Sequence, residues 1–445
     1  MRLIGNERGL SSALFLVLLT AIASGQETTR VSVDSSGAEG NDSSWWGGAM
    51  SADGRIVAFW GLASNLVPGD TNYEEDVFVR DRSTGITERI SVSSSGAEGN
   101  DQSGWPAISA DGRVVAFQSR ATNLVAGDTK GHSDIFVHDR STGLTERVSV
   151  NSSGAEATGG SFLPAISPDG RVVAFQSLAS NLVPGDTKGH PDIFVHDRST
   201  GLTERVSVNP SGAEANGWSS ESAISADGRV VAFSSYARNL VPGDTNNRSD
   251  VFVHHRSTGL TERVSVDSSG TEGNSGSGYP ALSAEGQLVA FYSKASNLVA
   301  GDTNFVSDAF VHELPCDADA SWSNYGAGFP GSNGIPPFTS RTDPVLGTRL
   351  ILDLGNSYGN DTAALLLAGY QEASIPTNRG GTLLLVPVLT LPLYVRWIGS
   401  TIEAGIPDEN QFCGLEVYLQ VLEVDPGAAK GVSFTAGLNL LLGSE

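Results

Sequence analysis

The chain has 445 residues, long enough for two or three domains, and its 50 acidic and 27 basic side chains give a formal net charge of −23. Nucleic-acid binding needs clustered Lys and Arg to displace counterions, so this excess of carboxylates argues against it. The charge instead fits solubility outside the cell or cationic partners such as divalent metal ions.

Residues 1–25 have the pattern of a signal peptide. Arg2 and Arg8 supply the positive start, residues 10–23 form an apolar stretch, and small residues around Ala23 offer a cleavage site. An N-terminal membrane anchor is the alternative, but it needs a longer apolar span, and no later stretch is long enough to cross a bilayer. We therefore expect an exported protein, either secreted or in the cell envelope.

Residues 26–314 contain five copies of one repeat. The segment Ser51-Ala-Asp-Gly-Arg returns, with small changes, at a constant spacing of 58 residues, beginning at Ser109, Ser167, Ser225 and Ser283. In the second copy we expect strands at 105–109, 113–119, 134–138 and 144–150, with an Asp-Gly hairpin turn between the first two. Four antiparallel strands per copy are typical of a propeller blade, so the sequence predicts an all-β, five-bladed β-propeller.

The two ends of the repeat array are complementary in sequence. The fifth copy stops after its third strand at Glu313, whereas a spare outer strand, Thr-Thr-Arg-Val-Ser-Val, occupies residues 28–33. We expect this N-terminal strand to complete the last blade and close the ring. Closure would also remove an open sheet edge that invites aggregation.

The segment Ser167-Pro-Asp-Gly-Arg-Val-Val-Ala-Phe175 resembles the repeat of TolB-like, WD-like propellers, and the resemblance covers about residues 28–314. It implies a propeller fold. The same repeat occurs in binding proteins, translocation components and the propeller domains of peptidases, so the resemblance leaves the function open.

Carboxylates recur in the long loop of every repeat. One interpretation is a Ca²⁺ ion in each loop, with Asp70, the Asn72 side chain and Asp76 as ligands in the first repeat. The matching ligands in the last two repeats are Asp244, Asn246, Asp250, Asp302, Asn304 and Asp308. Lys130 and Lys188 replace the Asn in the second and third repeats, which counts against a metal there. The alternative is that each Asp caps a turn or a strand by accepting backbone hydrogen bonds, in which case no cofactor is required.

Some residues break the repeat symmetry at or just before the first strands. These are Trp46, Trp105, Trp218, Glu221 and Tyr279. Fold constraints act equally on every repeat, so such exceptions are candidates for binding a sugar or a peptide side chain by stacking. Packing within the fold is the alternative.

Two features bear on catalysis. Gly355-Asn-Ser357-Tyr-Gly359 matches the nucleophile elbow of serine hydrolases, but all seven histidines lie at or before position 312, so no base follows the serine. Glycoside hydrolysis needs two carboxylates, and the inner strands offer only Glu221. We therefore predict that the protein is not an enzyme, with a carbohydrate-active enzyme as the alternative.

Residues 315–445 begin with a Gly- and Pro-rich passage and continue with several apolar runs of strand length, which predict a small β-sandwich. Cys316 and Cys413 are the two cysteines of the chain, and an oxidising compartment favours a disulfide between them. Tyr325-Gly-Ala-Gly-Phe-Pro-Gly, Phe412-Cys-Gly-Leu and Leu422-Glu-Val-Asp-Pro-Gly resemble a C-terminal module of exported proteins from planctomycetes and similar bacteria, which implies export.

The sequence thus predicts an exported propeller that binds, or acts as a scaffold for, a peptide, glycan or protein partner. Long loops on a rigid scaffold are where binding usually resides, so we place the site on the long-loop face. A purely structural surface module is a further alternative.

Overall fold

A computed structural model describes residues 28–315, 320–378, 381–407 and 412–444. The predicted signal peptide and Cys316 lie outside the described residues. The regular elements are the strands β1 to β30. Within the described ranges, no helix has the length and apolar character needed to cross a bilayer.

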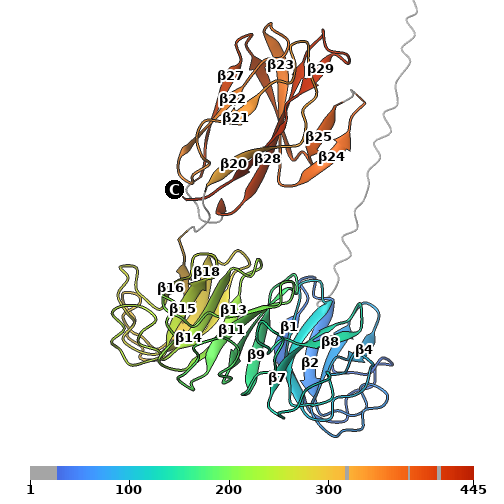
Figure 1. Cartoon of the computed structure of the whole chain (residues 1–445), viewed down its shortest axis with the longest axis vertical. Coiled ribbons are helices and arrows are strands. Elements are labelled where there is room, and N and C mark those ends of the chain that lie inside the picture. Colours follow the sequence, from blue (N-terminus) through green and yellow to red (C-terminus); the bar gives the residue numbers. More distant parts are fainter. Residues whose placement is uncertain (1–27, 316–319, 379–380, 408–411, 445) are drawn as a thin grey trace, which may run out of the picture.

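Each of the first four repeats folds into one antiparallel sheet whose four strands follow one another in chain order (Figure 1). The first sheet contains β1 (Ser44–Met50), β2 (Ile56–Gly61), β3 (Asp76–Asp81) and β4 (Ile86–Arg89), and the second contains β5 (Ser103–Ile108), β6 (Val114–Ser119), β7 (Asp134–Asp139) and β8 (Leu144–Arg147). The third contains β9 (Ser161–Ile166), β10 (Val172–Ser177), β11 (Asp192–Asp197) and β12 (Leu202–Arg205), and the fourth contains β13 (Ser219–Ile224), β14 (Val230–Ser235), β15 (Asp250–His255) and β16 (Leu260–Arg263). The repeated four-stranded antiparallel sheets confirm the all-β class and are consistent with a β-propeller.

The tight turn after each first strand is fixed by its Ser and Asp side chains. In the second repeat, Ser109 Oγ donates to Asp111 Oδ1 at 2.6 Å and accepts the Val114 backbone N–H at 2.9 Å. Gly112 follows with a φ of 71°, a conformation that glycine adopts without strain. The recurring Ser-x-Asp-Gly sequence therefore sets the hairpin that joins the first and second strands.

Hydrophobic clusters lie between consecutive sheets. Ala58 and Val79 from one face of the first sheet pack against Phe117 and Phe136 from the opposite face of the second. The two rings stack at a centroid distance of 5.9 Å. The same small-against-aromatic packing recurs at the next three interfaces, so the five sheets are stacked face to face in chain order.

The ring is not closed among the described residues. The fifth sheet has three strands, β17 (Ser277–Leu282), β18 (Leu288–Ser293) and β19 (Asp308–Glu313), and residues 28–30 are exposed and outside any strand. The first and fifth sheets lie at opposite ends of the row in Figure 1. The predicted closure by residues 28–33 is absent because Val33 is held on the first sheet, where its carbonyl accepts a hydrogen bond from Thr87 Oγ1 at 2.5 Å.

In the described part of the C-terminal region, the strands form three sheets. One sheet contains β20 (Ser321–Tyr325), β23 (Thr362–Gly369), β26 (Leu389–Val395), β28 (Glu416–Val424), β29 (Val432–Phe434) and β30 (Gly437–Leu441). A second sheet contains β21 (Phe338–Ser340), β22 (Arg349–Leu354) and β27 (Ser400–Gly405). In the third, β24 (Glu372–Pro376) pairs with β25 (Thr382–Leu385). The first two sheets share one hydrophobic core, to which β22 contributes Leu352 and β28 contributes Val421. Cys413 is buried, and its bridge to Cys316 stays a prediction.

Candidate functional site

A β-bulge interrupts the inner strand of every sheet. In the last four sheets the two residues outside the ladder are Trp105 and Pro106, Leu163 and Pro164, Glu221 and Ser222, and Tyr279 and Pro280. The first residue of each pair has a positive φ, between 51° and 57°. This conformation costs a non-glycine residue about 1–3 kcal/mol, and such strain collects at functional sites.

The four bulges line one pocket of about 400 Å³. Its walls combine the rings of Trp105 and Tyr279, the apolar side chain of Leu163 and three prolines with the carboxylate of Glu221. The lining contains no cationic side chain. Such a surface suits a neutral ligand that has a flat apolar face and hydrogen-bond donors.

Glu221 is held in position by two hydrogen bonds. Its Oε2 atom accepts the backbone N–H of Tyr279 and the hydroxyl of Ser234, both at 2.9 Å. The negative charge of Glu221 opposes ionisation of the nearby phenol and so raises the pKa of Tyr279 above its ordinary value of 10.0. The carboxylate therefore joins the fourth and fifth sheets at the pocket.

A second row of aromatic rings supports the exposed ones. Trp105 packs against Trp60 with a centroid distance of 5.4 Å, and Trp60 packs against Trp45 at 5.1 Å. Across the pocket, Tyr279 packs against Tyr292 at 5.4 Å. These contacts fix the orientation of Trp105 and Tyr279, although both remain substantially exposed.

The structure brings three of the five predicted binding residues together: Trp105, Glu221 and Tyr279. Trp218 does not line this pocket; it directly precedes β13, and its carbonyl accepts the Tyr236 backbone N–H at 2.8 Å. The side chain of Trp46 lies outside the described part. Sequence reasoning missed Leu163, which the recurrence of an apolar or aromatic residue before Pro at this repeat position could have revealed.

The predicted metal ligands of the first repeat lie around an arginine. Arg89 Nη1 is 3.7 Å from Asp70, 3.2 Å from Asp76 and 2.5 Å from Glu98. The same cluster recurs around Arg147, Arg205 and Arg263, and each guanidinium is buried to at least nine-tenths. In these four repeats the arginine occupies the place that a bound cation would take.

The asparagines of these loops turn their nitrogen toward the carboxylates. Asn72 Nδ2 donates to Asp76 Oδ2 at 3.2 Å, while Asn72 Oδ1 accepts the Glu74 backbone N–H. Asn246 is arranged in the same way, with Nδ2 3.0 Å from Asp250 Oδ2. Calcium requires oxygen ligands, so the geometry gives no support to calcium at the Asp70 or Asp244 loops.

Burial dominates the electrostatics of the inner aspartate in each cluster. It raises the pKa of Asp76, Asp134 and Asp250 to about 6 and that of Asp192 to about 7, despite the adjacent arginine. Glu98 differs, because hydrogen bonds from Thr71 and the charge of Arg89 outweigh its burial and lower its pKa. In the first cluster, the pKa of the inner aspartate is therefore raised while the pKa of the glutamate is lowered.

The fifth set, Asp302, Asn304 and Asp308, differs from the other four. Asn304 Nδ2 lies 3.2 Å from Asp308 Oδ2, as in the first and fourth repeats. No arginine of the described residues forms an ion pair with this set. Asp302 Oδ1 is buried without a hydrogen-bond partner, as are Asp128 Oδ1 and Asp244 Oδ1 in two of the complete clusters. The acidic cluster of the fifth repeat therefore lacks, among the described residues, the arginine that pairs with the other four.

Ser357 of the Gly-x-Ser-x-Gly match is buried in the connection between β22 and β23. Its Oγ atom is 2.5 Å from Glu423 Oε2 and 2.7 Å from Ser433 Oγ, and it is only 2% exposed. No histidine is available in this domain, since all of them precede residue 313. These contacts give Ser357 a structural role in the connection between β22 and β23.

No family model matches the chain. It is 31% identical over 102 residues to dipeptidyl-peptidase 5 of Porphyromonas gingivalis, a match that covers 23% of this chain and 14% of that protein. The chain thus spans a small part of that relative.

Solved structures give distant matches. A putative TolB from Agrobacterium tumefaciens aligns with a TM-score of 0.36 and 16% identity over 60% of this chain and 76% of that chain. An α-L-arabinofuranosidase from Fusarium graminearum aligns with a TM-score of 0.31 and 12% identity over 62% and 77% of the two chains. At these TM-scores neither likeness bears on the activity of this chain.

Proposed function

We propose that the chain is an exported, non-enzymatic binding protein that holds a neutral glycan in the bulge-lined pocket. The observation that carries this proposal is the convergence of four strained bulges on one pocket with two supported aromatic rings and one fixed carboxylate. Sugar rings offer apolar C–H faces to aromatic side chains and hydroxyl donors to a carboxylate. The binding site is therefore the inner-strand pocket rather than the long-loop face.

The charge of the pocket restricts the class of ligand that it can bind. Glu221 is the one acidic residue of the lining, and Lys and Arg are absent from it. Glycans that carry sulfate or carboxylate groups would meet an unfavourable field here. A neutral oligosaccharide is favoured, and a peptide with exposed aromatic or proline residues is an alternative outcome of the test.

The enzyme alternative depends on the same carboxylate. A glycosidase needs an acid and a second carboxylate about 5 to 9.5 Å away, and the pocket lining supplies only Glu221. Oε2 of Glu221 is also already engaged by the Tyr279 backbone N–H and the Ser234 hydroxyl. We therefore assign Glu221 to ligand binding.

The test is a neutral-glycan array followed by calorimetry with the best binder. Trp105→Ala and Tyr279→Ala are each expected to weaken binding about fivefold or more, because truncating a stacked ring costs more than about 1 kcal/mol. Trp218→Ala is the matched control, since this exposed tryptophan lies outside the pocket lining. Turnover of the bound glycan that is lost in Glu221→Gln would establish the enzyme instead, and binding to peptides alone would overturn the choice of glycan.

A further inference from the structure

The four complete sheets show how each outer strand is held. In the fourth sheet, Thr261 lies opposite His254 and Arg263 lies opposite Phe252. The Thr261 hydroxyl is 2.8 Å from His254 Nδ1 and donates to the carbonyl of Val208, in the segment that precedes the sheet, at 2.5 Å. The same threonine contacts recur in the second and third sheets. One outer strand therefore joins its own sheet to the preceding segment.

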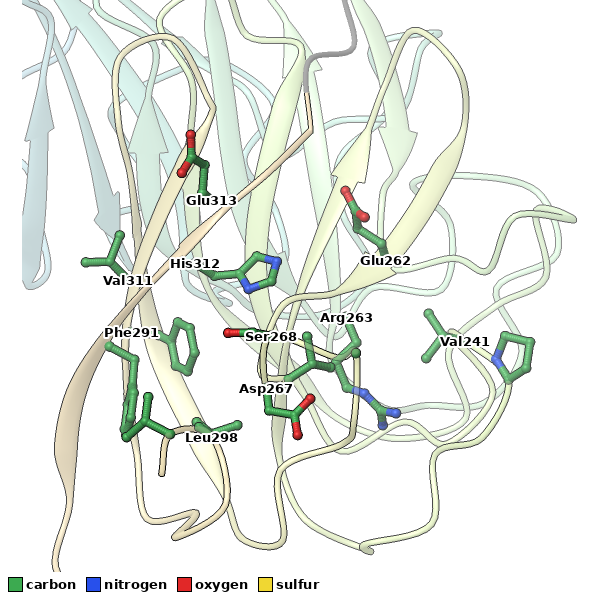
Figure 2. A pocket seen from close by; sticks show the side chains of 15 residues that line it. Val241, Glu262, Arg263, Asp267, Ser268, Phe291, Leu298, Val311, His312 and Glu313 are labelled. Carbon is green, nitrogen blue, oxygen red and sulfur yellow. The ribbon is translucent and has the colours of Figure 1, made fainter. Parts of the chain in front are cut away.

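The fifth sheet lacks this outer strand. Among the described residues, β19 pairs only with β18. A pocket of about 720 Å³ lies beside it, lined by Phe291, Phe310 and His312 of the fifth sheet and by Val266 and Ser268 of the preceding segment (Figure 2). In the other sheets, the outer strand and the buried residue that follows it, such as Val264, occupy the equivalent place. The pocket is thus the position of a missing strand.

Residues 28–39 carry the side chains that the fifth sheet lacks. Thr28, Arg30, Val31, Ser32 and Glu39 match, in order and spacing, Thr87, Arg89, Ile90, Ser91 and Glu98 of the first repeat. The register of the fourth sheet, applied to β19, places Thr28 opposite His312 and Arg30 opposite Phe310. The segment therefore supplies both the strand and its polar contacts.

The charges are complementary as well. Arg30 already pairs with Glu39, as Arg263 pairs with Glu272 in the fourth repeat. The fifth repeat holds the other half of the cluster, Asp302 and Asp308, and no arginine of the described residues forms an ion pair with them. Docking of the segment would place the Arg30 guanidinium among these carboxylates, as in the four complete clusters.

The sheet faces at the two ends also match. Leu288, Ala290, Ala309 and Val311 of the fifth sheet are exposed, with Val311 at 68%, whereas their counterparts in the first sheet are buried against the second. At the other end, the aromatic cluster around Phe59 and Phe78 includes no residue from another sheet. The exposed faces thus correspond to the two halves of one sheet-to-sheet interface.

In this arrangement the segment lies against the first sheet of its own chain. Val33 is bound to the first sheet, and five residues extend at most about 18 Å from it. Figure 1 shows the two sheets at opposite ends of the row. We propose that the open edge of the fifth sheet binds residues 28–39 and the first sheet of a second copy of this chain, in a head-to-tail interface.

Two variants, each with one cysteine added to the native Cys316 and Cys413, test this proposal. Thr29 falls opposite Val311 in the proposed register, so Thr29→Cys in one chain and Val311→Cys in another should form a disulfide-linked dimer when mixed and oxidised. Mixing Thr29→Cys with Leu144→Cys is the control, because Leu144, on the outer strand of the second sheet, is 60% exposed against 68% for Val311. A cross-link with Val311→Cys that exceeds the control several-fold supports the proposal.

Closure within one chain is the competing outcome. The double variant Thr29→Cys/Val311→Cys should give linked dimers or larger species, and a cross-linked monomer at high dilution would overturn the proposal. Equal cross-linking in the test and control mixtures would also overturn it. In sedimentation of the unmodified protein, we expect Arg30→Ala to weaken self-association by about tenfold, whereas Arg55→Ala, at an exposed position, should not.

Discussion

The backbone N–H of Tyr279 donates a hydrogen bond of 2.9 Å to Oε2 of Glu221, the residue at the same repeat position one sheet earlier. Two bulges of neighbouring sheets are thus tied together by a side chain that the other repeats lack. The bond places a negative charge beside the phenol of Tyr279 and fixes one wall of the pocket.

Replacing Glu221 by Gln should lower the pKa of Tyr279. The carboxylate stabilises the neutral phenol, so its removal lets Tyr279 ionise at lower pH. Spectroscopic titration of labelled tyrosines, with Tyr279→Phe to assign the signal, measures the change. An unchanged Tyr279 titration in Glu221→Gln would show that the two groups do not interact in solution.

The repeated sheets could be predicted because their signals are local and recur. The third strand predicted at 134–138 is β7, Asp134–Asp139, and the Ser-x-Asp-Gly turns lie where the spacing places them. Each signal depends on a few adjacent residues. It is either an apolar run or a glycine at a position where φ must be positive. Five copies of the same pattern removed most of the ambiguity.

The ion clusters and the open ring could not be predicted in this way. Arg89 is 19 residues from Asp70 in sequence, and only the pairing of Arg89 with Phe78 on β3 brings it to the carboxylates. Ring closure depends on the angle between successive sheets, which no short pattern encodes. The bulge at Glu221 could not be predicted from the sequence either, because Ser222 replaces the proline that follows the first bulge residue at the other three sites.

Removing the arginine from one cluster should be strongly destabilising. Arg147→Ala leaves Asp128, Asp134 and Glu156 without their cation in a buried site, so we expect a loss of about 3–5 kcal/mol in the free energy of unfolding. Urea unfolding measures this loss. Arg113→Ala serves as the control because its side chain is half exposed, and equal losses in the two variants would contradict a structural role for the cluster.

The inner aspartates should make stability depend on pH. The folded pKa of Asp134 is about 6, above its ordinary value of 3.8, so unfolding releases a proton between these values and the stability from this group is lost as pH rises from about 4 to about 6. Buried His254, with its pKa lowered by burial to about 4, acts in the opposite direction over part of this range.

The quantity to measure is therefore the difference between the wild type and Asp134→Asn. The wild type should lose stability relative to the variant as pH rises through this window, and the difference should level off above it. Unfolding curves at half-unit pH steps would show this. A difference that stays constant from pH 4 to pH 7 would mean that Asp134 titrates near its ordinary value.

Alanine substitutions at two glycines should distinguish the cost of a steric clash from the cost of backbone strain. Gly170 and Gly185 both have a positive φ, of 74° and 78°, but a Cβ at Gly170 would meet Val114 Cγ2 at 2.8 Å, whereas nothing lies within 4 Å of one at Gly185. Gly170→Ala should therefore cost about 1–3 kcal/mol more than Gly185→Ala. Thermal and urea unfolding of the two variants provide the comparison, and equal costs would show that Val114 moves aside freely.

Leu163 offers a direct test of strain at the pocket. Its φ of 52° is unfavourable for any residue with a Cβ, so Leu163→Gly should be more stable than Leu163→Ala by about 1 kcal/mol, the reverse of the usual order within a strand. Both variants lose the same apolar side chain from the pocket, so their ligand affinities should fall together. Phe162→Gly and Phe162→Ala form the matched control pair, because Phe162 lies in the ladder opposite Gln176 and should follow the usual order. If Leu163→Gly proves the less stable of its pair, the bulge stores no strain and its positive φ says nothing about function.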